Sequence, residues 1–87
     1  MILIMHIIIK GVSALDKYCL EVIFINNTKK IYDVKRLFSK WPIFNDLKNI
    51  KCLFKNVKVD TGGYGVFWND ELDLSSEELW DNGKIVK

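Results

Sequence analysis

Apolar and polar residues alternate along the first third of the chain, a pattern typical of β-strands. Residues 2–12 are almost continuously apolar and rich in β-branched isoleucine, so we predict a buried strand that ends near Gly11. A polar turn over residues 13–17 then leads to residues 18–26, in which alternate side chains fall on opposite faces. The less apolar of these faces carries only one charge, Glu21, so we expect this second strand to be central in its sheet.

Two turns are predicted from residues that tolerate a positive φ. Asn26-Asn27 separates the second strand from a third over residues 30–32, which gives an antiparallel meander. Thr61-Gly62-Gly63 lies between two further alternating stretches, at 56–60 and 64–69. The same glycines suggest a phosphate-binding loop, but such a loop feeds into a helix and is followed by Gly-Lys-Ser/Thr. A strand follows here instead, so we interpret the glycines as a hairpin turn.

The apolar period changes at Asp33, a residue suited to cap a helix N-terminus. Apolar residues then recur at helical spacing, at Val34, Leu37, Phe38 and Trp41. Pro42 ends this first helix, because proline forces the preceding residue out of the α region. A second, less regular stripe follows, formed by Phe44, Leu47, Ile50 and Phe54. These patterns predict two short helices with aromatic side chains in the core.

A third short helix is predicted near the C-terminus. Ser75 and Glu78 have the spacing of a capping box, in which each side chain satisfies a backbone amide at the other's position. The helix would end before Gly83.

Composition limits the class of protein. The chain has 87 residues, 49% of them hydrophobic, which predicts a single small domain over residues 1–87. Its longest apolar run is shorter than the ~20 residues that span a bilayer, and it lacks the features of an export signal, so we expect a soluble, cytoplasmic protein with no membrane partner. Cys19 and Cys52 are isolated and are expected to be free thiols. His6 is the only histidine, which disfavours zinc and nucleophile–histidine sites, and we expect no metal and no cofactor.

The net charge of +2 hides a strong asymmetry. Residues 1–58 carry eleven Lys or Arg against four Asp or Glu, a net charge of +7. Residues 59–87 carry two Lys against seven Asp or Glu, a net charge of −5. One part can complement the other within a monomer or across an oligomer.

A set of basic residues is the best functional candidate. They lie off the apolar stripes of the two predicted helices, where neighbouring helices would form one positive face for a nucleic acid or a partner protein: Lys35, Arg36, Lys40, Lys48, Lys51 and Lys55. Lysine dominates this set, and base reading by bidentate arginine is not indicated. A solvated helix face is the favoured interpretation, ahead of nucleic-acid binding.

Acidic residues gather in the C-terminal part of the chain. They could ligate a divalent cation, but their spacing does not fit an EF-hand loop, and the dipole of the predicted helix favours carboxylates at its start without a metal. No nucleophile or oxyanion donor accompanies them, so we predict no catalytic residues and no enzyme activity. The partner-facing candidates in this segment are Trp68, Asp70, Asp73 and Glu77.

The ordered set of motifs resembles a bacterial family catalogued as domain of unknown function 2442. The resemblance covers Ile9 to Asp81 and rests on YCLEVIFINN, KKIYDVKRLF, FNDLKN, CLFKNVKVD and VFWNDELDLSSEELW. Asn26-Asn27-Thr28 departs from the family, which commonly has a glycine in that turn, and the linker before Phe54 is slightly longer. The resemblance implies a small α+β protein without established catalytic residues, and gene neighbourhoods in the family have prompted a toxin–antitoxin suggestion.

We therefore predict one two-layer α+β domain, in which an antiparallel sheet of about five strands packs on two or three short helices. The leading functional hypothesis is a non-enzymatic protein-interaction module, either as a homodimer or with a small protein partner in a regulatory or toxin–antitoxin-like pair. The alternative is weak, non-specific nucleic-acid binding through the lysine-rich helical face. An enzyme is the least favoured interpretation.

Overall fold

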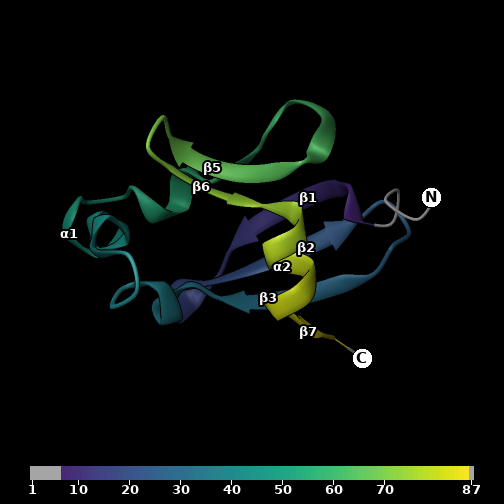
Figure 1. Ribbon diagram of the computed structural model, residues 1–87, viewed down its shortest axis with the longest axis horizontal. Helices are drawn as coiled ribbons and strands as arrows, with labels where there is room; N and C mark the ends of the chain where they lie inside the picture. The colour runs from purple at the N-terminus through teal and green to yellow at the C-terminus, as the bar shows by residue number, and fades with distance from the viewer. Residues whose placement is uncertain (1–6, 87) are drawn as a thin grey trace.

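The computed structural model describes residues 7–86 of the chain. His6 and the first residues of the predicted N-terminal strand lie outside the described residues. Within 7–86 the chain forms a small α+β structure, with antiparallel sheets of four and three strands and two short α-helices (Figure 1). No helix in this range is long and apolar enough to cross a membrane.

The four-stranded sheet has the order β1-β2-β3-β7. Its strands are β1 (Ile9–Ala14), β2 (Cys19–Phe24), β3 (Lys29–Asp33) and β7 (Lys84–Ile85). The predicted meander is confirmed, and β2 is central, with Leu20, Val22 and Phe24 fully buried on one face. The predicted turn is confirmed as well, because Asn27 has a φ of 69° and the Asn26 side chain accepts the amide of Thr28.

The first strand differs from its prediction at its C-terminal end, and the start predicted at residue 2 lies outside the described residues. It begins at Ile9, and it continues through Gly11 to Ala14 instead of ending near the glycine. The reason is register: after an irregularity between Ile9 and Gly11, the ladder with β2 continues to the Ala14–Leu20 pair. Because β1 reaches Ala14, the turn predicted over residues 13–17 begins later than expected.

The three-stranded sheet has the order β4-β5-β6, with strands β4 (Lys58–Val59), β5 (Gly65–Asn69) and β6 (Leu72–Ser75). The glycine turn between β4 and β5 is confirmed, with φ of 89° at Gly62 and 79° at Gly63. The prediction of one sheet of about five strands is wrong. At Gly63 the turn passes so close to β1 that a Cβ would lie 2.6 Å from the Ile9 carbonyl oxygen, and β4 and β5 pair with each other beside β1 instead of extending its ladder.

Residues 34–57, which we call the connecting segment, join the two sheets. They contain three 3₁₀ turns, Val34–Leu37, Pro42–Asn45 and Phe54–Asn56, and one short helix, α1 (Asp46–Asn49). The predicted cap is confirmed, because the Asp33 carboxylate accepts the amide N–H of Lys35. The two predicted helices are wrong in extent, and Trp41 and Ile50 of their apolar stripes remain 43% and 49% exposed.

A local polar contact explains why the first helix stops early. The Asn45 side-chain amide donates to the carbonyl oxygens of Phe38 and Pro42, at 2.9 and 3.0 Å, and so ties the chain into a compact loop. Pro42 lacks an amide N–H and restricts the residue before it. A helix this short gains too few hydrogen bonds to offset the cost of nucleation, so tertiary contacts decide its shape.

Helix α2 (Ser76–Asn82) lies over the four-stranded sheet (Figure 1). The Ser75 hydroxyl accepts the amide of Glu78, as predicted, but the Glu78 carboxylate accepts a bond from the buried Tyr32 hydroxyl at 2.7 Å instead of capping the helix. This bond ties α2 to β3, and burial followed by the bond to Glu78 raises the pKa of Tyr32 well above its ordinary value. On the same interface the Trp80 ring packs edge-on against Phe24, with centroids 4.9 Å apart.

Strand β7 was not predicted. It pairs with β3 through Lys30–Ile85 and Ile31–Lys84, after α2 has ended at Asn82 and the chain has turned at Gly83. Gly83 is needed there for space, since a Cβ would lie 2.5 Å from the Leu79 carbonyl oxygen. A strand of two residues is too short for its alternation to be recognised in a sequence.

Candidate interaction surface

The connecting segment is fixed to the second sheet through Phe54. The indole N–H of Trp68 on β5 donates to the Phe54 carbonyl oxygen at 3.0 Å, and the two rings stack with centroids 6.2 Å apart. Leu47 of α1 is buried in the same core. These contacts hold the surface of the segment in place although little of it is regular structure.

The turn between β1 and β2 packs against this segment. Lys17 and Tyr18, in the 3₁₀ turn Asp16–Tyr18, both adopt left-handed backbone conformations, with φ of 60° and 58°. The Tyr18 ring lies edge-on to Phe54 and Phe38, at centroid distances of 5.2 and 5.6 Å. Two consecutive left-handed residues are costly for side chains other than glycine, so surrounding contacts must stabilise the turn.

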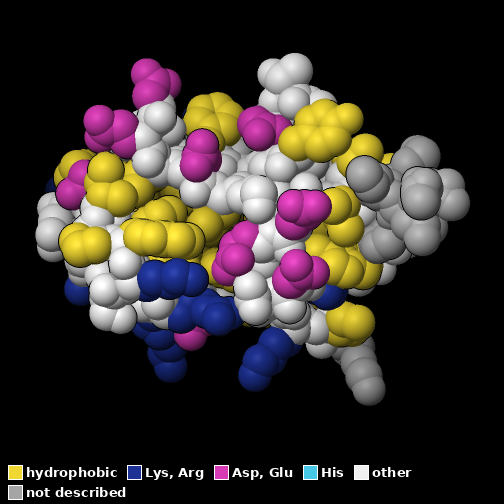
Figure 2. All heavy atoms as spheres, in the orientation of Figure 1, with side chains coloured by type: hydrophobic (Ala, Val, Ile, Leu, Met, Phe, Trp, Pro, Cys, Tyr) yellow, Lys and Arg dark blue, Asp and Glu magenta, His cyan; other side chains and the backbone are white. Residues whose placement is uncertain are grey.

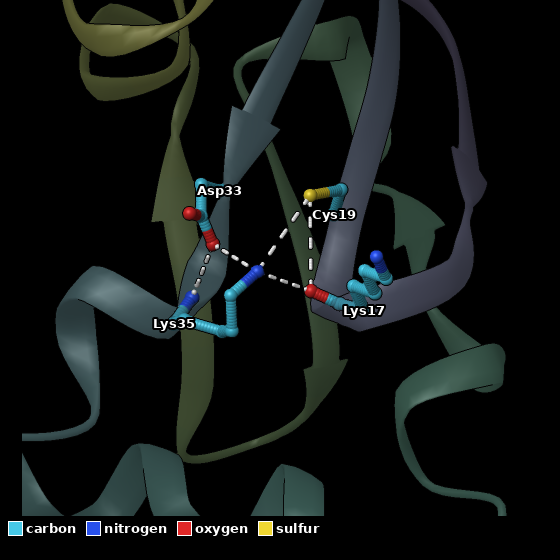
Figure 3. A network of polar contacts seen from close by, with 4 residues as sticks. All are labelled: Lys17, Cys19, Asp33 and Lys35. Carbon is cyan, nitrogen blue, oxygen red and sulfur yellow. Dashed lines mark hydrogen bonds and ion pairs between the residues drawn. The ribbon is translucent and has the colours of Figure 1, made fainter.

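Lys35 supplies one of these contacts (Figure 3). Its ammonium group donates to the Lys17 carbonyl oxygen at 2.5 Å, forms an ion pair with Asp33 at 2.9 Å, and lies 4.0 Å from the Cys19 sulfur. The hydrogen bond with Asp33 raises the pKa of Lys35. Partial burial acts to raise the pKa of Asp33, but the bonds from the Lys35 side chain and backbone outweigh it and lower that pKa.

A hollow of about 340 Å³ opens where the turn meets the connecting segment. Tyr18, Leu47 and Phe54 contribute to its lining, together with four lysines and two exposed apolar residues, Lys17, Lys48, Lys51, Lys55, Leu15 and Ile50. Asp16 is the one carboxylate among the lining residues, so the positive charge predominates. We call this feature the lysine groove.

The structure divides the predicted basic set into two groups. Lys48, Lys51 and Lys55 line the lysine groove together. The other members lie elsewhere: Lys35 holds the Lys17 turn, the Lys40 ammonium lies 4.7 Å from the Trp41 ring centroid, and Arg36 lines a separate hollow of about 370 Å³ with Asp33 and Lys84. The predicted face is therefore not a single surface.

The sequence interpretation missed Leu15, Lys17 and Tyr18 as groove residues. They come from the turn between the first two strands, far along the chain from Lys48, Lys51 and Lys55. One signal was present: Leu15 is a large apolar residue inside an otherwise polar turn, and an apolar residue at such a position needs a contact or stays exposed.

The acidic candidates lie on a different part of the surface. Asp70 and Glu71 form the turn between β5 and β6, Asp73 lies on β6, and Glu77 lies in the first turn of α2. All four are exposed, and we call them the acidic face. Figure 2 shows Asp and Glu side chains over the β5–β6 hairpin and α2, and Lys and Arg side chains along the opposite edge.

Trp68 does not belong to that surface. The sequence interpretation placed it among the partner-facing residues, but its side chain is 6% exposed and its indole nitrogen is bonded to Phe54. Alternation on β5 explains this, because Trp68 lies on the same side as the buried Val66.

The two cysteines, Cys19 and Cys52, are unpaired, as predicted. Cys52 lines the lysine groove and is exposed, whereas Cys19 belongs to the Lys35 contacts. Among residues 7–86, no group of three His, Cys, Asp or Glu side chains is arranged to hold a metal ion.

Comparison with known proteins identifies one family. Residues 9–84 match the family described as "Protein of unknown function (DUF2442)", which covers nearly the whole chain. No curated protein matches the chain, and no solved structure matches it.

Proposed function

The chain belongs to this family of proteins of unknown function, and from that premise we propose that it is a non-enzymatic interaction module whose lysine groove binds an acidic, partly apolar segment of a protein partner. One observation carries the proposal: Lys48, Lys51 and Lys55 surround the same hollow as the exposed Leu15 and Ile50. Ammonium groups attract carboxylates from a distance, and apolar contact then contributes affinity.

The size of the groove fits side chains of a protein. Its volume of about 340 Å³ is at the lower end of the range for ligand sites, so it can take one or two side chains of a longer segment. Leu15 and Ile50 are 41% and 49% exposed, and covering them would remove apolar surface from water. We therefore expect a partner segment with a leucine-like residue between carboxylates. This partner is either a second copy of this chain or another small cytoplasmic protein, in a regulatory or toxin–antitoxin-like pair.

Nucleic-acid binding is the second candidate, and Tyr18 is the observation that favours it. An aromatic ring beside lysines is the combination on which single-stranded nucleic acids stack. The Tyr18 ring already contacts Phe54 and Phe38, so part of its surface is not available for stacking. Such binding would depend steeply on salt and little on sequence.

The test uses fluorescence anisotropy with two labelled probes, a peptide of alternating glutamate and leucine and a single-stranded oligothymidine. The groove variant carries Lys51→Glu and Lys55→Glu. Its control carries Lys10→Glu and Lys84→Glu, which change the net charge equally at exposed positions outside the groove. We expect the groove variant to bind the peptide at least about tenfold more weakly and the control to bind it within about twofold of the wild type.

Three results would count against the proposal. Equal losses in the two variants would mean that the peptide responds to overall charge and not to the groove. Absence of peptide binding by the wild type at low salt would reject the module as proposed. Tighter binding of the oligothymidine, lost steeply as salt rises, would establish the second candidate instead.

A further inference from the structure

Two surfaces of opposite charge are left without ion pairs to each other in the monomer. The two ion pairs formed within residues 7–86 join Lys29 to Glu21 and Lys35 to Asp33, and all four residues belong to the basic part of the chain. Neither the lysine groove nor the acidic face takes part in them. Within the described residues, no ion pair joins the lysines of the groove to the carboxylates of the acidic face, so the two surfaces keep opposite charges.

We propose that the lysine groove binds the acidic face of a second copy of this chain. The proposal rests on the electrostatic part of the proposed function, the attraction of carboxylates to the groove lysines, and takes a second copy as the acidic partner. Leu72 beside Glu71 is buried and does not enter the groove. Its central contact places Asp70 and Glu71 of one copy beside Lys51 and Lys55 of the other. Asp73 and Glu77 extend the negative surface beside that turn.

The turn that carries Asp70 and Glu71 is held in shape before any contact forms. The Asn69 side-chain oxygen accepts the amide N–H groups of Glu71 and Leu72, at 2.9 and 3.0 Å. The turn lies at the outer end of the β5–β6 hairpin (Figure 1), so its carboxylates can approach another molecule without rearrangement of the core. A preorganised turn loses little conformational entropy on binding.

Of the three other carboxylates in residues 59–87, Asp81 is exposed and lies near Lys30, where burial lowers the pKa of the lysine and Asp81 acts to raise it; the other two accept hydrogen bonds within the fold. Glu78 accepts the Tyr32 hydroxyl, and Asp60 accepts the backbone amide of Tyr64. Both therefore have an internal role in the fold. The side chains of the acidic face form no hydrogen bond or ion pair with any other residue in the described range, so their charge is directed outward.

The overall charge permits self-association. The net charge of the chain is only +2, so repulsion between two copies is weak while attraction between the opposed surfaces is local. Each copy carries both surfaces, and a pair of copies related by a twofold axis would form the contact twice. We expect a reversible complex that weakens as salt rises, because exposed ion pairs are screened.

The test is a charge-swap experiment followed by sedimentation velocity at low and high salt. One variant carries Lys51→Glu and Lys55→Glu, and the other carries Asp70→Lys and Glu71→Lys. We expect the wild type to associate at low salt and each variant alone to associate at least about tenfold more weakly. An equimolar mixture of the two should associate again, because the acidic groove of one meets the basic turn of the other. The Lys10→Glu and Lys84→Glu control should associate like the wild type.

Circular dichroism of each variant shows that it is folded before it is compared. A wild type that remains monomeric at low salt, or a mixture that remains as monomeric as its components, overturns the inference. The glutamate–leucine peptide separates this failure from failure of the proposed function. If the peptide binds the wild type and not the groove variant while the wild type is monomeric, the groove binds a different acidic partner. If neither the peptide nor a second copy binds, both proposals fail.

Discussion

The meander β1–β3 and the connecting segment are both rich in apolar residues, but they use them differently. In β2 every second side chain is completely buried, and Leu20, Val22 and Phe24 are all 0% exposed. In the connecting segment some stripe residues are buried, whereas Trp41 and Ile50 stay nearly half exposed. The ladder hydrogen bonds of a sheet fix which face each side chain takes, and the short turns of the connecting segment impose no such rule.

This difference in burial means that some apolar side chains stabilise the fold while others are available for binding. The fully buried face of β2 contributes to the core and offers no surface to a partner. The connecting segment leaves Ile50 exposed beside lysines and so retains surface for a partner. The lysine groove thus forms where the periodic pattern is least regular. Substitutions in the two regions should therefore affect different measurements.

The largest expected effect tests this separation with one aromatic residue from each region. Phe24→Ala should lower the free energy of unfolding by about 3–5 kcal/mol, because it leaves a cavity in the core and removes the contact with Trp80. Trp41→Ala should cost less than about 1 kcal/mol, because 43% of Trp41 is already exposed. Urea unfolding followed by circular dichroism measures both. Similar losses in the two variants would mean that the connecting segment is as tightly packed as the meander.

A smaller effect is expected where the meander is tied to α2. Tyr32→Phe removes the hydrogen bond to the Glu78 carboxylate and should lower the free energy of unfolding by about 1–2 kcal/mol at neutral pH. The raised pKa of Tyr32 gives the sign of the pH dependence. Above pH of about 10 the unfolded chain releases the tyrosine proton while the folded chain keeps it, so stability falls as pH rises. The free energy of unfolding, measured as pH rises above about 10, should fall less in Tyr32→Phe than in the wild type.

The next comparison is between two lysines that the sequence pattern treats alike. Lys35→Met should lower the urea midpoint, because it removes the contacts that hold the left-handed turn at Lys17 and Tyr18. Lys51→Met should leave the midpoint unchanged and weaken peptide binding. The Asp33 pKa is lowered, so its ion pair contributes above the unfolded pKa of about 3.9 and is lost as pH falls through the folded value. The difference in urea midpoint between Lys35→Met and the wild type should therefore become smaller in acid.

Most of the strands could be predicted because strand alternation is a local pattern. Residues 18–26, the Asn26-Asn27 turn and the strand after Gly63 are all recognisable from a few neighbouring residues. The division into two sheets could not be predicted in this way. It involves contacts between positions far apart in the sequence, such as the close approach of Gly63 to Ile9.

The candidate site shows the same limit. The outward position of Lys48, Lys51 and Lys55 followed from the apolar stripe beside them, and all three line the groove. The other side of the groove comes from the Asp16–Tyr18 turn, which no local pattern places beside residue 51. Helical spacing also does not show that the Asn45 side chain bonds to the Phe38 carbonyl oxygen, where the first predicted helix has already ended in the structure, or that Trp41 stays exposed. Short helices follow tertiary contacts more than their own periodicity.

The smallest expected effect on stability gives the sharpest test of the comparison. Ile50→Ser should change the free energy of unfolding by less than about 0.5 kcal/mol, because the side chain is 49% exposed. The same change should weaken binding of the glutamate–leucine peptide about fivefold, since binding would cover the exposed part of the isoleucine. Ile85→Ser is the matched control, because Ile85 is 61% exposed on β7 and does not line the groove. If Ile85→Ser weakened binding of the peptide as much as Ile50→Ser does, exposed apolar surface at any position would explain binding. The connecting segment would then have no specific role in it. A loss of affinity confined to Ile50→Ser, at unchanged stability, would assign binding to the exposed surface of the connecting segment.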